Sequence, residues 1–281
     1  MRIALSFMRS RAIATIALAI LLGSARGADA DPVMGRVLTA PTAWLPPSGA
    51  IVGTIGGTFG ADNQSAGMFD VGIGLGGIAS VDVGVDTDVR GCSMCDPGDS
   101  DAAPLWMGRA AFRIGARQDA WFRGMPALVI GLRNTFAAHG HTFGAARSTE
   151  AYLVASRSMG PIRVHAGVQA TEAAHGARDA HLEPTIRPIM GFEWTPGIYP
   201  RSTLLGDVAW LPRMEPDDVR MKWMVGVGVR YQALWWGSIE LAVRLREDDG
   251  LSQPTALVRL NGVLSPRSQR DRDGQKNRLA K

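Results

Sequence analysis

Two cysteines and four histidines are the residues of this sequence whose types and spacing are best suited to bind a metal ion. Thiolate and imidazole are ligands that zinc and copper prefer. A small disulfide in an oxidising compartment is the alternative use of the two cysteines, and the spacing matches no closed zinc pattern. Both interpretations stay open for the set, which comprises Cys92, Cys95, His139, His141, His175 and His181.

A second set, His141, Ser148 and Glu150, contains the residue types of nucleophilic acyl transfer. In such a set a base activates the serine hydroxyl and an acid orients the base. The sequence has no G-x-S-x-G motif, which marks the nucleophile of one large class of hydrolases. We therefore favour a protein without enzymatic activity and keep a lipid-modifying enzyme as the alternative.

The formal net charge of +4 is concentrated at the two ends of the chain. Residues 1–30 hold four basic residues and one acidic residue, and residues 265–281 hold six basic and two acidic residues. The basic composition is therefore poor support for nucleic-acid binding. The 34 glycines include no phosphate-binding loop and no dinucleotide fingerprint, so we expect no soluble cofactor.

The first thirty residues have the pattern of an export signal. Three arginines precede an uncharged apolar run from Ala12 to Leu22, and small residues follow up to Ala28-Asp29-Ala30. The apolar run is shorter than the roughly 20 residues that a spanning helix needs. We predict cleavage after Ala30, a periplasmic leader over residues 31–49, and a disordered basic periplasmic tail over residues 265–281.

Between these ends, apolar residues alternate with polar or small residues at a period of two. The clearest example runs from Met221 to Tyr231, where apolar side chains stand at every second position. A helix would scatter these residues around its circumference, so the pattern predicts strands. We expect twelve strands, over residues 50–59, 67–75, 78–89, 104–117, 127–137, 148–158, 161–171, 184–195, 202–212, 220–232, 237–246 and 254–263.

The lengths of the segments and of their connections narrow the architecture. A tilted strand crosses a bilayer in about 9–11 residues, which is close to the length of most of these segments. Short connections such as Gly76-Gly77 and Met159-Gly160 alternate with longer polar ones such as 90–103. This alternation is typical of a barrel whose short turns face the periplasm and whose long loops face outward.

Aromatic residues gather at both ends of the predicted strands, as they do in the two girdles of a membrane barrel. Trp121, Phe122, Trp194, Tyr199, Trp235 and Trp236 lie at the short turns, and Phe59, Phe69, Trp106, Phe136, Trp210 and Trp223 lie near the long loops. A soluble two-sheet sandwich would not require this distribution. The sequence therefore predicts an all-β, transmembrane, up-and-down antiparallel barrel of about twelve strands over residues 50–264.

The inward face of these strands is predicted to carry many charged side chains. Such residues need water or partners, so they either line an aqueous path that favours anions or brace a closed lumen through arginine–carboxylate pairs. We expect the lining to comprise Arg109, Arg113, Arg133, Arg163, Arg187, Arg230, Arg244, Arg259, Glu193 and Glu240, with Asp82, Asp207 and Lys222 on the same face.

On these features the chain resembles the bacterial outer-membrane β-barrel proteins over essentially its whole mature region. The stretch from Gly35 to Gly49 is also similar to the leader before the first strand in some exopolysaccharide-linked barrels, and we carry no function across from it. The resemblance implies an outer-membrane location, contact with outer-membrane lipid, and a small porin-like channel or a passive barrel, with small anions as candidate solutes. A structural barrel that binds a periplasmic partner is the alternative.

Most such barrels end on an aromatic residue of their last strand. Here we expect the last strand to close at Leu264, and seventeen residues follow it. The C-terminal signal that the insertion machinery reads is therefore not in its usual place. The fold prediction does not depend on that signal.

Overall fold

The structure is a computed structural model that describes residues 35–60, 65–91, 103–140, 144–176, 180–215, 217–247 and 253–265. Within these ranges no helix is long and apolar enough to cross a membrane. The predicted signal peptide, most of the predicted tail, and Cys92, Cys95 and His141 lie outside the described residues. The strands are β1 (Ile51–Phe59), β2 (Ala66–Leu75), β3 (Ala79–Asp86), β4 (Arg90–Gly91), β5 (Ala103–Pro104), β6 (Met107–Ala116), β7 (Ala127–Gly140), β8 (Gly144–Met159), β9 (Ile162–His175), β10 (Ala180–Trp194), β11 (Ser202–Glu215), β12 (Asp218–Leu234), β13 (Gly237–Arg246) and β14 (Thr255–Leu264).

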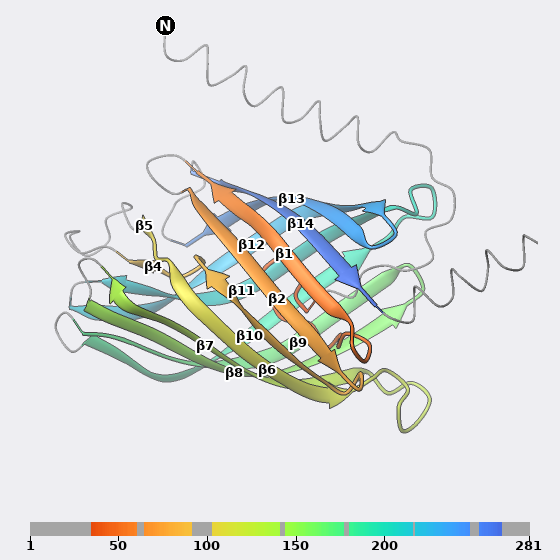
Figure 1. Cartoon of the computed structure of the whole chain (residues 1–281), viewed down its shortest axis with the longest axis horizontal. Helices are drawn as coiled ribbons and strands as arrows, with labels where there is room; N and C mark the ends of the chain where they lie inside the picture. The colour runs from red at the N-terminus through yellow and green to blue at the C-terminus, as the bar shows by residue number, and fades with distance from the viewer. Residues whose placement is uncertain are drawn as a thin grey trace, which may run out of the picture.

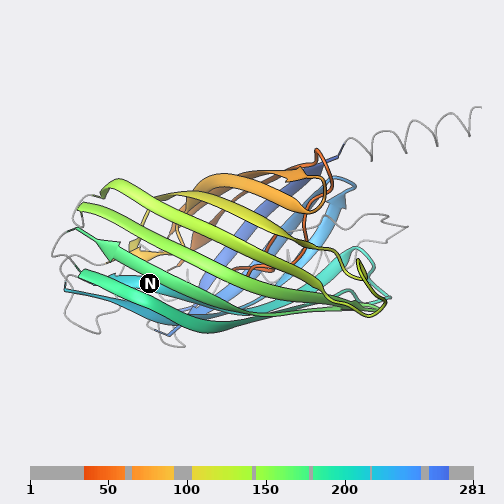
Figure 2. The ribbon, with the colours of Figure 1, turned by 90° about the horizontal axis from the view of Figure 1, so that it is seen from below.

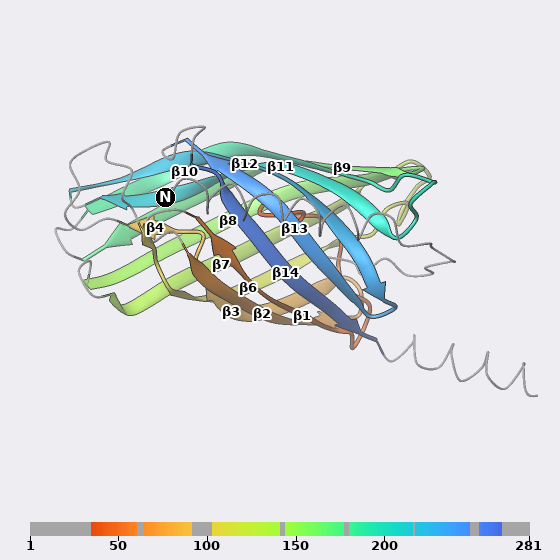
Figure 3. The same ribbon diagram turned by 90° about the horizontal axis from the view of Figure 1, so that it is seen from above.

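Twelve of these strands form one closed antiparallel barrel, and the prediction of the fold class is confirmed. Each long strand pairs with its neighbours in sequence order, and β1 pairs with β14 from Ile51 opposite Leu264 to Phe59 opposite Ala256. The strands run obliquely around the barrel (Figure 1), and β14 and β1 lie side by side where the cylinder closes (Figure 3). Every predicted segment overlaps one barrel strand.

The short turns at one end of the barrel need backbone conformations that favour glycine. Gly76 and Gly77 join β2 to β3 with φ angles of 63° and 70°, and Gly160 joins β8 to β9 with a φ of 61°. Short hairpin connections commonly contain residues with positive φ. These turns set the register of the two hairpins, as the glycines in the sequence indicate.

Apolar side chains cover the outer face of the barrel. Ile55, Ile130 and Val227 are 61%, 59% and 53% exposed, and aliphatic residues at every second position of the other strands are similarly exposed. Trp121 and Phe122 at the short turns, and Phe59 and Trp106 near the long loops, are exposed as well. An apolar band between aromatic girdles is the surface that a bilayer-spanning barrel presents to lipid.

The strand predicted over residues 78–89 is shorter in the structure, because β3 ends at Asp86. The chain then turns into the barrel, and Thr87, Asp88 and Val89 are buried. Asp88 accepts a hydrogen bond from Arg244 Nη1 at 2.7 Å, and Arg246 Nη1 donates to its backbone carbonyl at 2.7 Å. Because of these inward contacts, Thr87, Asp88 and Val89 are not part of the barrel wall.

The wall between β10 and β11 is paired over only part of its height. The ladder joins Met190–Trp194 to residues 204–208 and stops there. Beyond this point β11 pairs with the short strand β4 instead, and the carbonyl of Trp210 accepts a hydrogen bond from the inward side chain of Gln169 on β9. Pro188 on β10 lacks the backbone donor that a continued ladder needs. The long-loop end of β11 therefore lies on the inner side of β9.

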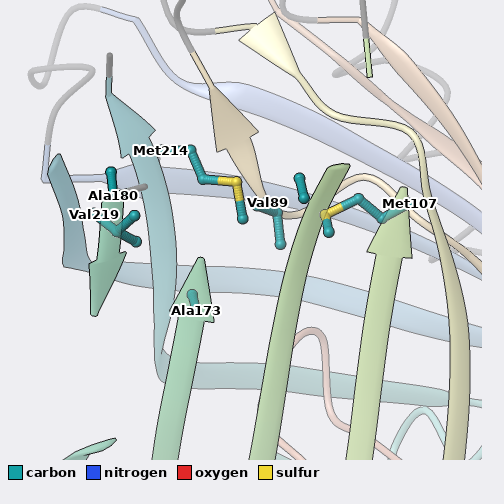
Figure 4. Close-up of a cluster of buried hydrophobic side chains, with 7 residues drawn as sticks. Val89, Met107, Ala173, Ala180, Met214 and Val219 are labelled. Atoms are coloured by element: carbon teal, nitrogen blue, oxygen red, sulfur yellow. The ribbon is translucent and has the colours of Figure 1, made fainter. Parts of the chain in front are cut away.

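A cluster of apolar side chains fills the interior of the barrel at its long-loop end. Each member comes from a different element, and all are at most 7% exposed. The close-up in Figure 4 shows these side chains converging from strands around the barrel. The cluster comprises Val89, Met107, Ala146, Ala173, Ala180, Met214 and Val219. Apolar side chains are therefore part of the lining at this end of the interior.

Candidate functional site

Residues 35–50, here called the internal segment, lie inside the barrel. Its first half is a tight hairpin, in which the Thr42 nitrogen donates to the Gly35 carbonyl at 2.9 Å and the Val37 nitrogen donates to the Ala40 carbonyl at 3.0 Å. Figure 2 shows this red-orange stretch between the walls of the barrel. The described part of the leader predicted over residues 31–49 is packed within the strands.

One carboxylate holds the tip of the internal segment. Asp207 Oδ2, on β11, accepts the backbone N–H groups of Leu38, Thr39 and Ala40 at 3.0, 2.5 and 2.7 Å. Successive N–H groups that converge on one anion form a concave site that stabilises negative charge. The sequence predicted that Asp207 faces inward. In the structure, its hydrogen-bond partners are backbone N–H groups of the same chain.

An arginine holds the same tip from the opposite side of the peptide groups. Arg259, on β14, donates to the carbonyl of Leu38 at 2.8 Å and to the carbonyl of Val37 at 3.0 Å. The same guanidinium pairs with Glu240 at 2.6 Å. Because backbone donors and acceptors are both satisfied by charged groups, the tip is buried without loss of hydrogen bonds.

The second half of the internal segment rests on β8 and β9. The Ala43 nitrogen donates to Ser156 Oγ at 2.7 Å, and Ser156 Oγ lies 2.7 Å from Nδ1 of His165. The Trp44 ring meets the His165 ring edge-on, with 6.1 Å between the centroids. On its far side, Nε2 of His165 lies 3.9 Å from Oε1 of Glu193. The serine, histidine and glutamate are all buried.

Contacts of the internal segment reach strands on every side of the closed cylinder. Besides β8, β9, β11 and β14, Arg113 on β6 lies 3.5 Å from the Trp44 carbonyl, and Arg244 on β13 lies 3.4 Å from Thr39 Oγ1. A segment can touch six such strands only from within. Val37 and Leu38 add apolar contacts to Leu205 and Leu257. The internal segment is therefore part of the filling of the barrel.

The charged residues predicted to face inward are mostly buried and paired across neighbouring strands. Arg109 binds Asp70 at 2.7 Å and Asp82 at 2.6 Å, and Arg133 Nε binds Glu150 at 2.8 Å. Among the predicted residues, Asp82, Arg109, Arg113, Arg133, Glu193, Asp207, Arg230, Glu240, Arg244 and Arg259 are at most 9% exposed. Whether they line a solute path stays a prediction, since the pairs equally serve to brace the wall.

Three of the predicted inward residues are less enclosed. The Arg163 side chain is 31% exposed and pairs with Glu193 at 3.1 Å. Arg187 is partly buried, and its guanidinium lies 4.9 Å from the centre of the Trp210 ring. Lys222 is 21% exposed and pairs with Glu247 at 3.2 Å. The first two keep an inner position, and the third lies toward the long-loop rim.

Sequence reasoning missed several inward carboxylates, so the interior is more nearly balanced in charge than predicted. Asp86, Asp88, Glu150 and Glu215 are all buried. Glu150 had the correct alternation but an ambiguous strand phase, and Asp88 lies beyond the end of its strand. His165 has the same inward alternation as Arg163, and Ser156 lies on the same strand as Glu150. Neither residue carries a fixed charge, so charge gives no signal for the contact of these two residues with the internal segment.

Only part of the sets considered for catalysis and metal binding lies within the described structure. Ser148 and Glu150 share one face of β8, and Glu150 is bound by Arg133. His175 is buried, with Nε2 at 2.7 Å from the Glu215 carbonyl, whereas His181 is exposed. No group of three or more metal-ligating side chains occurs among the residues that the structure describes. The side chain of His139 falls outside them.

Two spaces in the described structure are lined by inward-facing arginines. One, of about 60 Å³, lies between the segment and the wall near Arg109, Arg113 and Tyr152. The other, of about 200 Å³, opens at the short-turn end and is lined by Arg163, Arg201, Arg230 and hydroxyl and amide side chains. The second space is mainly polar, in contrast to the apolar cluster at the long-loop end.

The sequence matches no protein-family model and no curated relative. In structure the chain is similar to the KdgM porin, with a TM-score of 0.51 and 6% identity, over 76% of this chain and 99% of that one. The OmpT outer membrane protein of Vibrio cholerae, as its loop L8 deletion mutant, aligns with a TM-score of 0.42 and 8% identity over 77% of this chain and 100% of that one. The translocator domain of NalP from Neisseria meningitidis aligns with a TM-score of 0.38 and 9% identity over 94% and 97%. This chain has the fold of the bacterial outer-membrane β-barrels.

Proposed function

We propose that the protein is a small outer-membrane channel whose passage is closed, in this conformation, by the internal segment. The observation that carries the proposal is the set of hydrogen bonds between the inner wall and the backbone of that segment. Asp207, Arg259 and Ser156, all on the inner wall, hold it through hydrogen bonds to its backbone. Water can replace the peptide groups as hydrogen-bond partners of these wall residues when the segment leaves. The apolar contacts of Val37 and Leu38 with Leu205 and Leu257 are lost in the same step.

The number of strands supports the same conclusion. Barrels of about eight strands are filled by their own side chains, and barrels of about 16 strands hold open channels. Twelve strands lie between these limits, and here residues 35–50 occupy space that the wall side chains leave. If the segment moves aside, the space that it leaves is narrow and lined by charged groups, and a solute passes the apolar cluster of Val89, Met107 and Met214 at the long-loop end.

The charge of the inner face favours small anions, by a modest margin. Nine arginines and eight carboxylates are buried among the described residues, and the partly exposed Arg163 and Arg187 add to the basic side. Fixed positive charge along a narrow path lowers the barrier for anions. We expect chloride to be preferred over potassium once the passage is open.

The proposal is tested by locking the internal segment to the wall. A Cβ atom built at Gly191 would lie 2.9 Å from Cγ2 of Val37, within reach of a disulfide, whose two Cβ atoms are about 3.8 Å apart. The variant carries Val37→Cys and Gly191→Cys, with Cys92 and Cys95 changed to alanine to prevent mispairing. Planar-bilayer conductance is recorded for the oxidised and the reduced protein.

We expect the oxidised variant to stay closed, and the reduced variant and a deletion of residues 35–47 to conduct with a reversal potential that favours chloride. The same experiment on the background without the two new cysteines controls for the reductant. Equal conductance of the oxidised and reduced forms would show that the segment is not the block. Absence of conductance in the deletion variant would favour the structural barrel instead.

A further inference from the structure

The 200 Å³ space at the short-turn end is built from the ends of three strands and the turns that join them. Arg163 begins β9, Arg201 and Thr203 stand at the start of β11, and Arg230 and Gln232 stand near the end of β12. Its volume is many times the roughly 10–15 Å³ that one water molecule requires. The space is therefore large enough for a small hydrated ligand.

Basic side chains outnumber acidic ones around this space. No acidic residue is among its described lining residues. Beneath it, Glu193 is shared by Arg163 at 3.1 Å and Arg230 at 3.4 Å. Glu240 is likewise shared by Arg230 at 2.7 Å and Arg259 at 2.6 Å. With Arg201, four guanidinium groups stand over two carboxylates, so the surroundings of this space carry a positive excess.

The remaining polar groups suit an oxygen-rich ligand. Thr195 Oγ1 and Thr203 Oγ1 lie 2.9 Å apart at the rim, and Gln232, whose Nε2 donates to the Leu234 carbonyl, also lines the space. Guanidinium and hydroxyl groups are donors that bind phosphate and carboxylate oxygens. Together these donors can surround an oxyanion from several directions.

The frame around these donors is fixed by backbone hydrogen bonds. The Gln232 nitrogen donates to the Arg201 carbonyl at 2.8 Å, and the Thr195 nitrogen donates to the Pro161 carbonyl at 2.9 Å. Arg230 is only 2% exposed and is held by its two glutamates. A site whose donors are already positioned loses less conformational entropy when a ligand binds.

We infer that this space is a binding site for a small oxyanion, such as inorganic phosphate or the phosphate or carboxylate group of a small solute. The inference deepens the proposed function, because it places a solute-binding step at the short-turn mouth of the channel. Binding itself does not require the internal segment to move, since the site is open at that mouth.

The test is titration of the folded full chain in detergent with inorganic phosphate, followed by calorimetry and by ³¹P line broadening. The site variant is Arg201→Gln with Thr203→Val, which leaves the buried pairs of Arg230 untouched. The matched control is Arg157→Gln, an exposed arginine of β8 outside the lining. Circular dichroism checks that each protein retains its β-barrel.

We expect the site variant to bind phosphate at least tenfold more weakly, with the control unchanged, and sulfate to compete where chloride at equal ionic strength does not. No saturable binding by the unaltered chain, or equal binding by both variants, would overturn the inference. Phosphate binding by the full chain, with no bilayer conductance of the deletion variant, would support the binding site and contradict the proposed channel. Conductance of the deletion variant, with no phosphate binding by the full chain, would support the channel and contradict the binding site.

Discussion

Oδ2 of Asp207 lies 2.7 Å from the backbone nitrogen of Ala40, although the two residues are 167 positions apart in the chain. The contact joins a barrel strand to the internal segment, and the same oxygen accepts two further N–H groups. A buried carboxylate with three backbone donors is both well satisfied and costly to remove. Asp207 thus anchors the tip of the internal segment to the wall.

Replacing Asp207 with alanine should lower the free energy of unfolding by about 3 kcal/mol, because three buried donors lose a charged acceptor. Urea unfolding in phospholipid vesicles, followed by tryptophan fluorescence, measures the change. Asp218→Asn is the matched control, since the Asp218 side chain is 46% exposed at the start of β12. Similar small losses in both variants would show that Asp207 does not anchor the internal segment.

Arg133 and Glu150 should behave as a coupled pair. Removing either partner leaves a buried charge without its counterpart, which typically costs about 3–5 kcal/mol. In the double variant Arg133→Met, Glu150→Gln, the loss of unfolding free energy should be smaller than the sum of the two single losses by at least about 1 kcal/mol. The measurement is a double-mutant cycle of unfolding free energies, and strict additivity would mean that the two side chains do not interact.

Val227 tests the lipid face. The side chain is 53% exposed on the outer surface of β12, and an arginine near the middle of a membrane-spanning strand costs about 2–4 kcal/mol. Val227→Arg should show this loss in lipid vesicles, and Val227→Leu should stay within about 0.5 kcal/mol of the unaltered chain. A loss for arginine no larger than for leucine would contradict the membrane assignment of this face.

The neighbouring Gly228 faces inward, yet it is not a tolerant position. A Cβ atom there would lie 2.5 Å from Cβ of Ala242 and 2.6 Å from the Leu241 carbonyl. The alternation alone predicts a mild effect for a small polar side chain at Gly228, and the close approach of β13 overrules that prediction. Leucine at Val227 is for this reason the better control for the lipid face.

The topology can be mapped with inserted tags. A tag near Gly98 or Asp249, in the two long connections, should be accessible from outside intact cells, and a tag at Gly160 should not. Gly160 suits an insertion, because a Cβ atom there would meet nothing within 4 Å. Antibody labelling of intact and permeabilised cells gives the measurement, and labelling of Gly160 alone in intact cells would invert the orientation.

The period of two along the sequence was enough to predict the barrel, because the two faces of a strand meet different solvents and each face imposes its own residue types. Glycines at Gly76, Gly77 and Gly160 indicated short turns, since those turns need positive φ. The same alternation predicted the inward positions of Asp207 and Arg259. All of these properties are local, so a linear pattern records them.

What these inward groups bind was decided only by the tertiary structure. Residues 35–50 have no strand period, and their polar contacts are backbone groups that every sequence carries, so nothing in the chain marks Asp207 and Arg259 as their partners. The inward turn at Asp88 and the incomplete ladder between β10 and β11 likewise depend on contacts between distant elements. A sequence pattern reports which face a residue takes, whereas only the closed barrel determines which residues meet inside it.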